Sequence, residues 1–99
     1  MNDLLCLVET YFVQRQFKFP NVWQAMAWLN TEVGEVYELL LIRDGGWVRN
    51  NPKIKSQWSS DALADELGDI LMMVVVVGLV EKVNPVEALI KKMRRKINE

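Results

Sequence analysis

Apolar residues recur at intervals of three and four positions through four segments of the chain, and this pattern limits how it can fold. The two longest series run through residues 22–43 and 60–80, and shorter series occupy residues 3–16 and 85–99. Such spacing gathers apolar side chains on one face of an α-helix. The pattern therefore predicts an all-α fold in which four helices form a bundle. The length of 99 residues suits a single domain, residues 1–99.

Cap residues mark where these helices begin. Asn21 precedes the second helix, and Gln24 follows three residues later, as in a reciprocal capping box. Ser59 or Ser60 is expected to cap the third helix, and Asn84, followed by a proline, the fourth. The polar segment between the two long helices contains Gly-Gly and Asn-Pro and is expected to form a loop, residues 44–60, that carries Trp47, Arg49, Lys53 and Lys55.

The two long helices are each expected to bury an apolar seam, to which Val33 and Leu67 belong. The run ILMMVVVVGLV, residues 70–80, is too short for a bilayer, which needs about 20 apolar residues. It is also more apolar than a small four-helix layer can bury, so part of it should form an interface. We therefore expect a homodimer or homotetramer, with residues 74–80 near its two-fold axis.

Charge and composition exclude several classes of protein. Twelve basic and thirteen acidic residues nearly cancel, which argues against a nucleic-acid or membrane partner. The chain has no histidine, so His-based catalysis and His-rich zinc sites are excluded. Cys6 is the single cysteine and cannot form an internal disulfide. With no targeting segment evident, a cytoplasmic location is expected.

Two acidic pairs stand within the apolar series of the long helices. TEVGEVYELL holds Glu32 and Glu35, and ADELGDILMM holds Glu66 and Asp69. Residues three apart share a helix face, so four carboxylates converge if the two helices pack side by side. Their repulsion would be costly without a cation, and all-oxygen ligation suits Mg²⁺, with Mn²⁺ as a substitute. A single E-x-x-E is usually a solvated face, and Glu38 and Asp65 are expected to face solvent.

These two stretches, read together, resemble the signature of the MazG-like nucleoside triphosphate pyrophosphohydrolases, which is E-E-x-x-E on one helix and E-x-x-D on the next. The resemblance covers roughly residues 22–96. It implies that Glu32, Glu35, Glu66 and Asp69 bind magnesium. It also implies that the chain hydrolyses a nucleotide between the α and β phosphates and works as a dimer or tetramer of helical bundles.

The chain departs from this signature at two places. Thr31 replaces its first Glu, which leaves the base open. The attacking water could be deprotonated by a ligand carboxylate such as Glu35, or a hydroxide could form on the metal itself. In the family's K-M-x-x-N motif, Lys92 matches, whereas Lys96 replaces the Asn. Candidate substrate-binding residues are Trp28, which could wall the site or stack on a base, and the cationic side chains of Lys92, Arg95 and Lys96.

The sequence thus predicts a magnesium-dependent nucleotide pyrophosphohydrolase that converts nucleoside or deoxynucleoside triphosphates to the monophosphate and pyrophosphate. One alternative is a phosphoribosyl-ATP pyrophosphohydrolase, which uses similar carboxylate pairs. Another is a non-catalytic helical module that binds metal or a partner protein. The preferred base and sugar are left open, as is the choice between standard and damaged nucleotides.

Overall fold

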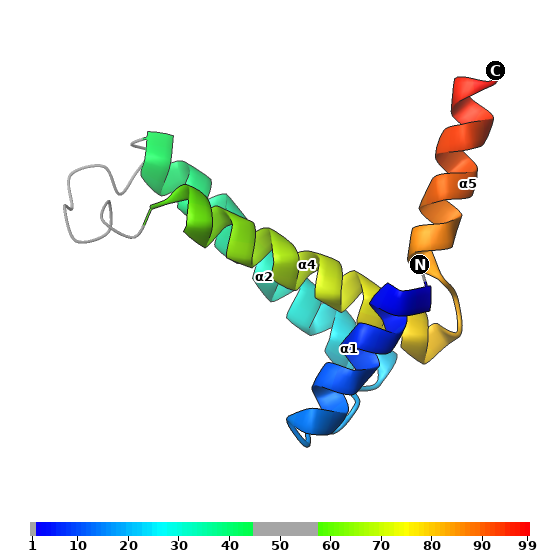
Figure 1. Ribbon diagram of the computed structural model, residues 1–99. Coiled ribbons are helices and arrows are strands. Elements are labelled where there is room, and N and C mark those ends of the chain that lie inside the picture. The colour runs from blue at the N-terminus through cyan, green and yellow to red at the C-terminus, as the bar shows by residue number, and fades with distance from the viewer. Residues whose placement is uncertain (1, 45–57) are drawn as a thin grey trace. The chain divides into compact units, whose positions relative to one another are not determined.

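The protein is all-α, as predicted, in a computed structural model that describes residues 2–44 and 58–99. The four helices of this part of the chain are α1 (Asn2–Gln14), α2 (Val22–Asp44), α4 (Ser60–Glu81) and α5 (Pro85–Ile97), shown in Figure 1. No strand occurs within these two ranges. Trp47, Arg49, Lys53 and Lys55, which the sequence assigned to the loop, lie outside the described residues.

The predicted helix caps are confirmed by their hydrogen bonds. The backbone N–H of Asn21 donates to Gln24 Oε1 at 3.0 Å, and that of Gln24 donates to Asn21 Oδ1 at 2.8 Å. Ser59 Oγ accepts the N–H of Ala62 at 2.9 Å, at the start of α4. The side chain of Asn84 accepts two N–H groups from the first turn of α5. Local hydrogen bonding therefore determines where α2, α4 and α5 begin.

The end of α4 is a tight turn that requires a glycine. Lys82 adopts a positive φ of 59°, and the N–H of Val83 donates back to the carbonyl oxygen of Gly78 at 2.8 Å. A Cβ atom on Gly78 would lie 2.5 Å from the carbonyl oxygen of Val83 and 2.6 Å from the Cδ of Pro85. Gly78 thus lets the chain fold back closely before α5 begins.

The described chain divides into two compact units. The first comprises Met1–Met26 and Met72–Glu99, and the second is Ala27–Leu71. In the first unit, Phe12 and Met73 are fully buried, and the ring centroids of Phe12 and Phe19 lie 4.9 Å apart. In the run of residues 70–80, Leu71 is 65% exposed and no residue between 72 and 80 is exposed; the interface that the sequence predicts for part of this run stays a prediction.

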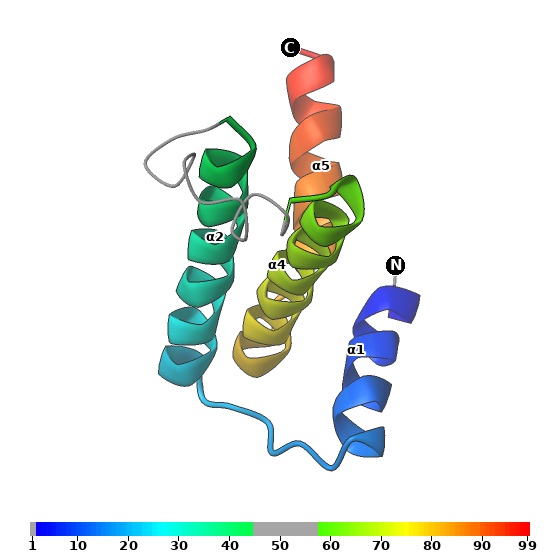
Figure 2. The ribbon, with the colours of Figure 1, turned by 90° about the vertical axis from the view of Figure 1, so that its left-hand side faces the viewer.

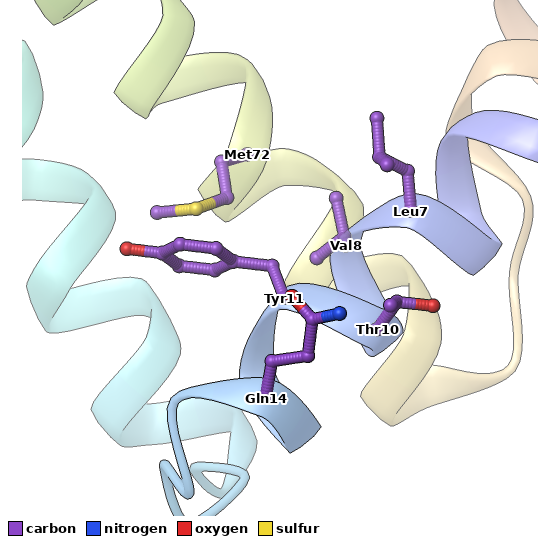
Figure 3. A pocket seen from close by; sticks show the side chains of 6 residues that line it. All are labelled: Leu7, Val8, Thr10, Tyr11, Gln14 and Met72. Atoms are coloured by element: carbon purple, nitrogen blue, oxygen red, sulfur yellow. The ribbon is translucent and has the colours of Figure 1, made fainter.

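A pocket of about 340 Å³ lies in the first unit, and Figure 3 shows the side chains around it. Its lining consists of Leu7, Val8, Thr10, Tyr11, Gln14 and Met72. These side chains include no carboxylate and no cation. The pocket is therefore a poor candidate for a catalytic site.

In the second unit, α2 and α4 run side by side in opposite directions, as both views show (Figures 1 and 2). Val33 is 49% exposed and Leu67 is 45% exposed, although both belong to the seams that were expected to be buried. Glu32, in contrast, is buried. The expectation for these two seam residues is wrong, because the sides of α2 and α4 that face each other carry carboxylates.

The sequence predicted that the run of residues 70–80 is too short to span a membrane. Across residues 2–44 and 58–99, none of the helices is long and apolar enough to cross a bilayer.

Candidate metal centre

The acidic pairs of α2 and α4 meet within the second unit. One carboxylate oxygen from each of Glu32, Glu35 and Glu66 lies within 4.8 Å of the other two. A second group, formed by Asp65, Glu66 and Asp69, meets the same limit. Glu66 belongs to both groups. The predicted convergence is therefore present, as two overlapping groups of three carboxylates rather than one group of four.

Helix geometry explains which side chains take part. Glu32 and Glu35 are three residues apart, as are Glu66 and Asp69, so each pair occupies one side of its helix. Asp65 precedes Asp69 by four residues and shares that side. Asp65 is exposed, as expected, yet its carboxylate joins the second group. The four-residue spacing between Asp65 and Asp69 was the sequence signal that could have placed Asp65 in the cluster.

Two carboxylate oxygens of this cluster are buried without a hydrogen-bond partner. They are Oε2 of Glu32 and Oε2 of Glu66. Glu32 is the most deeply buried of the acidic residues, with 9% of its surface exposed. Buried polar atoms in folded proteins are nearly always paired, since an unpaired one costs about 1–3 kcal/mol. The two orphaned oxygens therefore point to a ligand that would satisfy them.

The other oxygen of Glu32 has a donor. The indole nitrogen of Trp28 donates to Glu32 Oε1 at 2.9 Å. Trp28 lies one helical turn before Glu32 on α2. Apart from the carboxyl groups of the cluster itself, this is the single side-chain donor to the four predicted metal ligands within residues 2–44 and 58–99.

Crowding of the carboxylates changes their acidity. The pKa of Glu66 rises from 4.5 to about 7, first because its carboxyl shares a hydrogen bond with Glu35, and also because of burial and the charges of Glu35 and Glu32. The pKa of Asp69 is raised as well, mainly by burial and then by the charges of Glu32 and Asp65. Near neutral pH, a proton on Glu66 therefore relieves part of the repulsion.

No basic side chain performs that task in the part of the chain that the structure describes. The ion pairs there join Arg43 to Asp44, Lys91 to Glu87 and Lys96 to Glu99. None of them involves the carboxylate cluster. The cluster offers oxygen ligands alone. Such a ligand set suits Mg²⁺ and Mn²⁺ better than it suits Zn²⁺. The residues present thus fit a hard divalent cation.

Comparison of the chain with protein-family models, with curated proteins and with solved structures found no match. The resemblance to MazG-like enzymes accordingly depends on the two acidic motifs and stays a prediction.

The remaining predicted site residues divide between the two units. Trp28 lies beside Glu32 in the second unit. Lys92, Arg95 and Lys96 lie on α5, in the first unit, and all three are exposed. Their predicted contact with a substrate stays a prediction.

Thr31 occupies the position of the missing family glutamate. Its hydroxyl donates to the carbonyl oxygen of Ala27 at 3.1 Å, within the same helix. The hydroxyl is thus bonded within α2, and the choice of Glu35 as the base stays a prediction.

Proposed function

We propose that this protein is a magnesium-dependent nucleotide pyrophosphohydrolase, which cleaves nucleoside or deoxynucleoside triphosphates to the monophosphate and pyrophosphate. The observation that carries the proposal is the pair of buried, unpartnered carboxylate oxygens of Glu32 and Glu66, in a cluster without a described cationic partner. A cluster built only to stabilise the fold would have paired these oxygens with an amide, hydroxyl or cationic donor.

Glu32, Glu35, Glu66 and Asp69 would hold the metal in this proposal. A bound Mg²⁺ would neutralise phosphate charge, polarise the α-phosphoryl group and lower the pKa of a water molecule, and Mn²⁺ could replace it. Glu35 is half-buried and belongs to the first carboxylate group, so it can accept the proton of the attacking water. The cluster is strongly negative, and a triphosphate can approach it only with cations between them.

Recognition of the substrate is assigned to cationic and aromatic side chains. Lys92 and Arg95 are exposed and, among the described residues, form no ion pair. The Nζ atom of Lys96 lies 3.7 Å from Oε2 of Glu99. This is a weak surface ion pair, in which a phosphate can take the place of the Glu99 carboxylate. We assign phosphate contacts to these three residues and a wall of the nucleotide site to Trp28. A cytoplasmic setting follows from the proposed substrate.

The proposed assembly is a homodimer or homotetramer. Val33 and Tyr37 on α2 and Leu67 and Leu71 on α4 are all exposed. Val33 and Leu67 each follow a clustered glutamate by one residue. Because α2 and α4 are antiparallel, that step rotates both side chains to the same side of the helix pair. We call these four residues the apolar face.

The apolar face suits a second copy of the chain. Two helices alone form one layer, and a two-fold axis would place the same face of another pair against it. The resulting four helices would bury the exposed aliphatic and aromatic side chains while leaving the polar side, with Thr31 and Asp65, open to solvent. The sequence placed residues 74–80 near the two-fold axis; none of these residues is exposed, so the proposal uses the apolar face instead.

The test of the function is a panel of nucleotides incubated with Mg²⁺, with products separated by anion exchange. The proposal expects a monophosphate and pyrophosphate, no diphosphate, and loss of activity with EDTA. A diphosphate with orthophosphate would show that the bond assignment is wrong. Turnover of phosphoribosyl-ATP alone would favour that enzyme instead. Complete inertness, together with tight binding of a protein partner, would favour the non-catalytic module.

A further inference from the structure

Trp28 and Glu32 form a specific pair within the candidate metal centre. They are one turn apart on α2, and the indole N–H meets Glu32 Oε1 at 2.9 Å. The other oxygen of the same carboxylate, Oε2, is buried and unpartnered. One side of Glu32 is thus held by the protein, and the other is left free for a ligand.

The indole group has two properties that suit it to orient a metal-binding carboxylate. An indole N–H is a donor only, so it cannot replace a carboxylate as a metal ligand. It is also neutral, whereas an arginine at the same place would cancel the charge that attracts the cation. A neutral donor therefore fixes the orientation of a ligating carboxylate and leaves its charge intact, as hydrogen bonds to metal ligands commonly do.

We propose that Trp28 is a positioning residue, whose indole N–H holds Glu32 Oε1 so that Oε2 faces the divalent cation. This inference rests on the proposed function, because it requires a metal ion at the carboxylate cluster. It also gives Trp28 a role that differs from stacking on a nucleotide base: the role is exerted through Glu32 and is present before any substrate binds.

Trp23 provides a matched control on the same helix. It lies five residues before Trp28 and is 80% exposed, whereas Trp28 is 39% exposed. Trp23→Phe makes the same chemical change without touching a clustered carboxylate. Trp28→Phe retains an aromatic ring but removes the donor. Trp28→Gln removes the ring but retains an N–H donor one turn before Glu32, a spacing at which glutamine can bond to an acidic side chain.

The first measurement is a calorimetric titration of the metal-free proteins with Mn²⁺, in the absence of nucleotide. Trp28→Phe should weaken Mn²⁺ binding by about tenfold, the lower limit for loss of a partner that orients a ligand. Trp28→Gln should recover a large part of that loss, and Trp23→Phe should bind as tightly as the parent. A tryptophan that acted only by its bulk would give the opposite order for the two Trp28 variants.

The second measurement uses the unmodified protein, so it does not depend on whether a variant folds. In a ¹H–¹⁵N NMR spectrum, the indole signal of Trp28 should exchange with water more slowly than that of Trp23, both before and after addition of Mg²⁺. It should also shift on Mg²⁺ addition, because the cation draws charge from its acceptor, Glu32. The signal of Trp23 should move little.

The outcomes separate the two claims. If Mn²⁺ binds the parent but Trp28→Phe binds it equally well, the positioning role is overturned and the metal centre stands. The positioning role is also overturned if both Trp28 variants bind equally weakly, or if the indole N–H exchanges rapidly with Mg²⁺ bound. If the parent binds no Mn²⁺, the proposed metal centre fails, and the role of Trp28 fails with it.

Discussion

Glu32 exposes 9% of its surface, whereas the next residue on α2, Val33, exposes 49%. Glu66 and Leu67 repeat this relationship on α4, with a half-buried carboxylate followed by a largely exposed leucine. An amphipathic helix normally does the reverse, because burying aliphatic surface is favourable and burying a carboxylate is costly. Such a departure from the stabilising pattern is expected at functional sites, which are often maintained at a cost in stability.

Stability of the metal-free protein should fall as the pH rises. The pKa of Glu66 is about 7 in the folded protein against an ordinary value of 4.5, so the folded state binds this proton more tightly than the unfolded state. Its contribution is complete below the lower value and is lost as the pH passes the higher one. We expect a loss of about 1–2 kcal/mol in the free energy of unfolding between about pH 5 and pH 7.5, allowing for solvent screening of a half-buried group.

Thermal unfolding in EDTA at a series of pH values measures this change. Glu66→Gln should flatten the decline, because the group that titrates is gone. Glu38→Gln changes an exposed carboxylate of α2 outside the two groups and should leave the slope as in the parent. A parent whose melting temperature is constant or rises over this range would contradict the crowding of Glu66 against Glu32 and Glu35.

Asp69→Asn should separate catalysis from stability. The substitution keeps the shape of the side chain and removes one charge from the second carboxylate group. Turnover should fall by about 100-fold or more, because a ligand of the catalytic ion is lost. The metal-free variant should unfold at the same temperature as the parent or higher, since repulsion decreases. Mg²⁺ should raise the melting temperature of the parent and raise that of the variant much less.

Turnover and unfolding of this variant can each contradict the role of Asp69. An Asp69→Asn protein that retains full turnover would show that Asp69 does not bind the catalytic ion. One that unfolds without metal would show that Asp69 has a structural role.

Local features of the structure could be predicted from the sequence, because local contacts produce them. Asn21 with Gln24, Ser59 and Asn84 each cap a helix through hydrogen bonds that span two or three residues. The meeting of the two acidic pairs was also predictable, since a three-residue spacing gives each pair one helix face, and antiparallel packing needs only a loop between the helices.

Features that depend on how helices rotate against each other were not predictable. Apolar periodicity identifies a stripe on α2 but not its partner, so Val33 was expected in a buried seam and is exposed. Asp65 was expected to face solvent and to take no part in the cluster. It is exposed, but its carboxylate still extends toward Asp69. The bond between Trp28 and Glu32 had a sequence signal, the four-residue spacing, but its existence depends on side-chain rotamers.

Self-association should depend on the apolar face. We expect the parent protein to be at least a dimer in multi-angle light scattering at micromolar concentration. Leu71→Lys should shift it toward the monomer, because a charge would be buried at the interface. Val13→Lys places the same charge on an exposed position of α1 and should leave the mass unchanged. A parent that is monomeric at this concentration, or a Leu71→Lys protein with unchanged mass, would refute the assignment of this face.

Two glycines of α4 should respond oppositely to alanine. Gly78→Ala forces a Cβ atom against the carbonyl oxygen of Val83 and the ring of Pro85, so it should destabilise the protein by about 1–3 kcal/mol. At Gly68, apart from its chain neighbours and the backbone of its own helix, no atom of residues 2–44 and 58–99 lies within 4 Å of the corresponding Cβ position. Gly68→Ala should therefore stabilise the helix by about 0.5–1 kcal/mol. Denaturant unfolding measures both, and a Gly78→Ala protein as stable as the parent would show that the turn after α4 is looser than these contacts require.

The most direct test of the metal centre is a calorimetric titration of the metal-free protein with Mg²⁺ near pH 7, repeated in two buffers with different ionisation enthalpies. If Mg²⁺ binds where Glu66 shares its proton with Glu35, saturable binding should release a fraction of a proton per protein chain, so the measured heat should differ between the buffers. Glu66→Gln should greatly weaken binding and abolish the proton release. Absence of saturable binding, or binding that is unchanged in Glu66→Gln, would contradict the assignment of the carboxylate cluster as a metal centre.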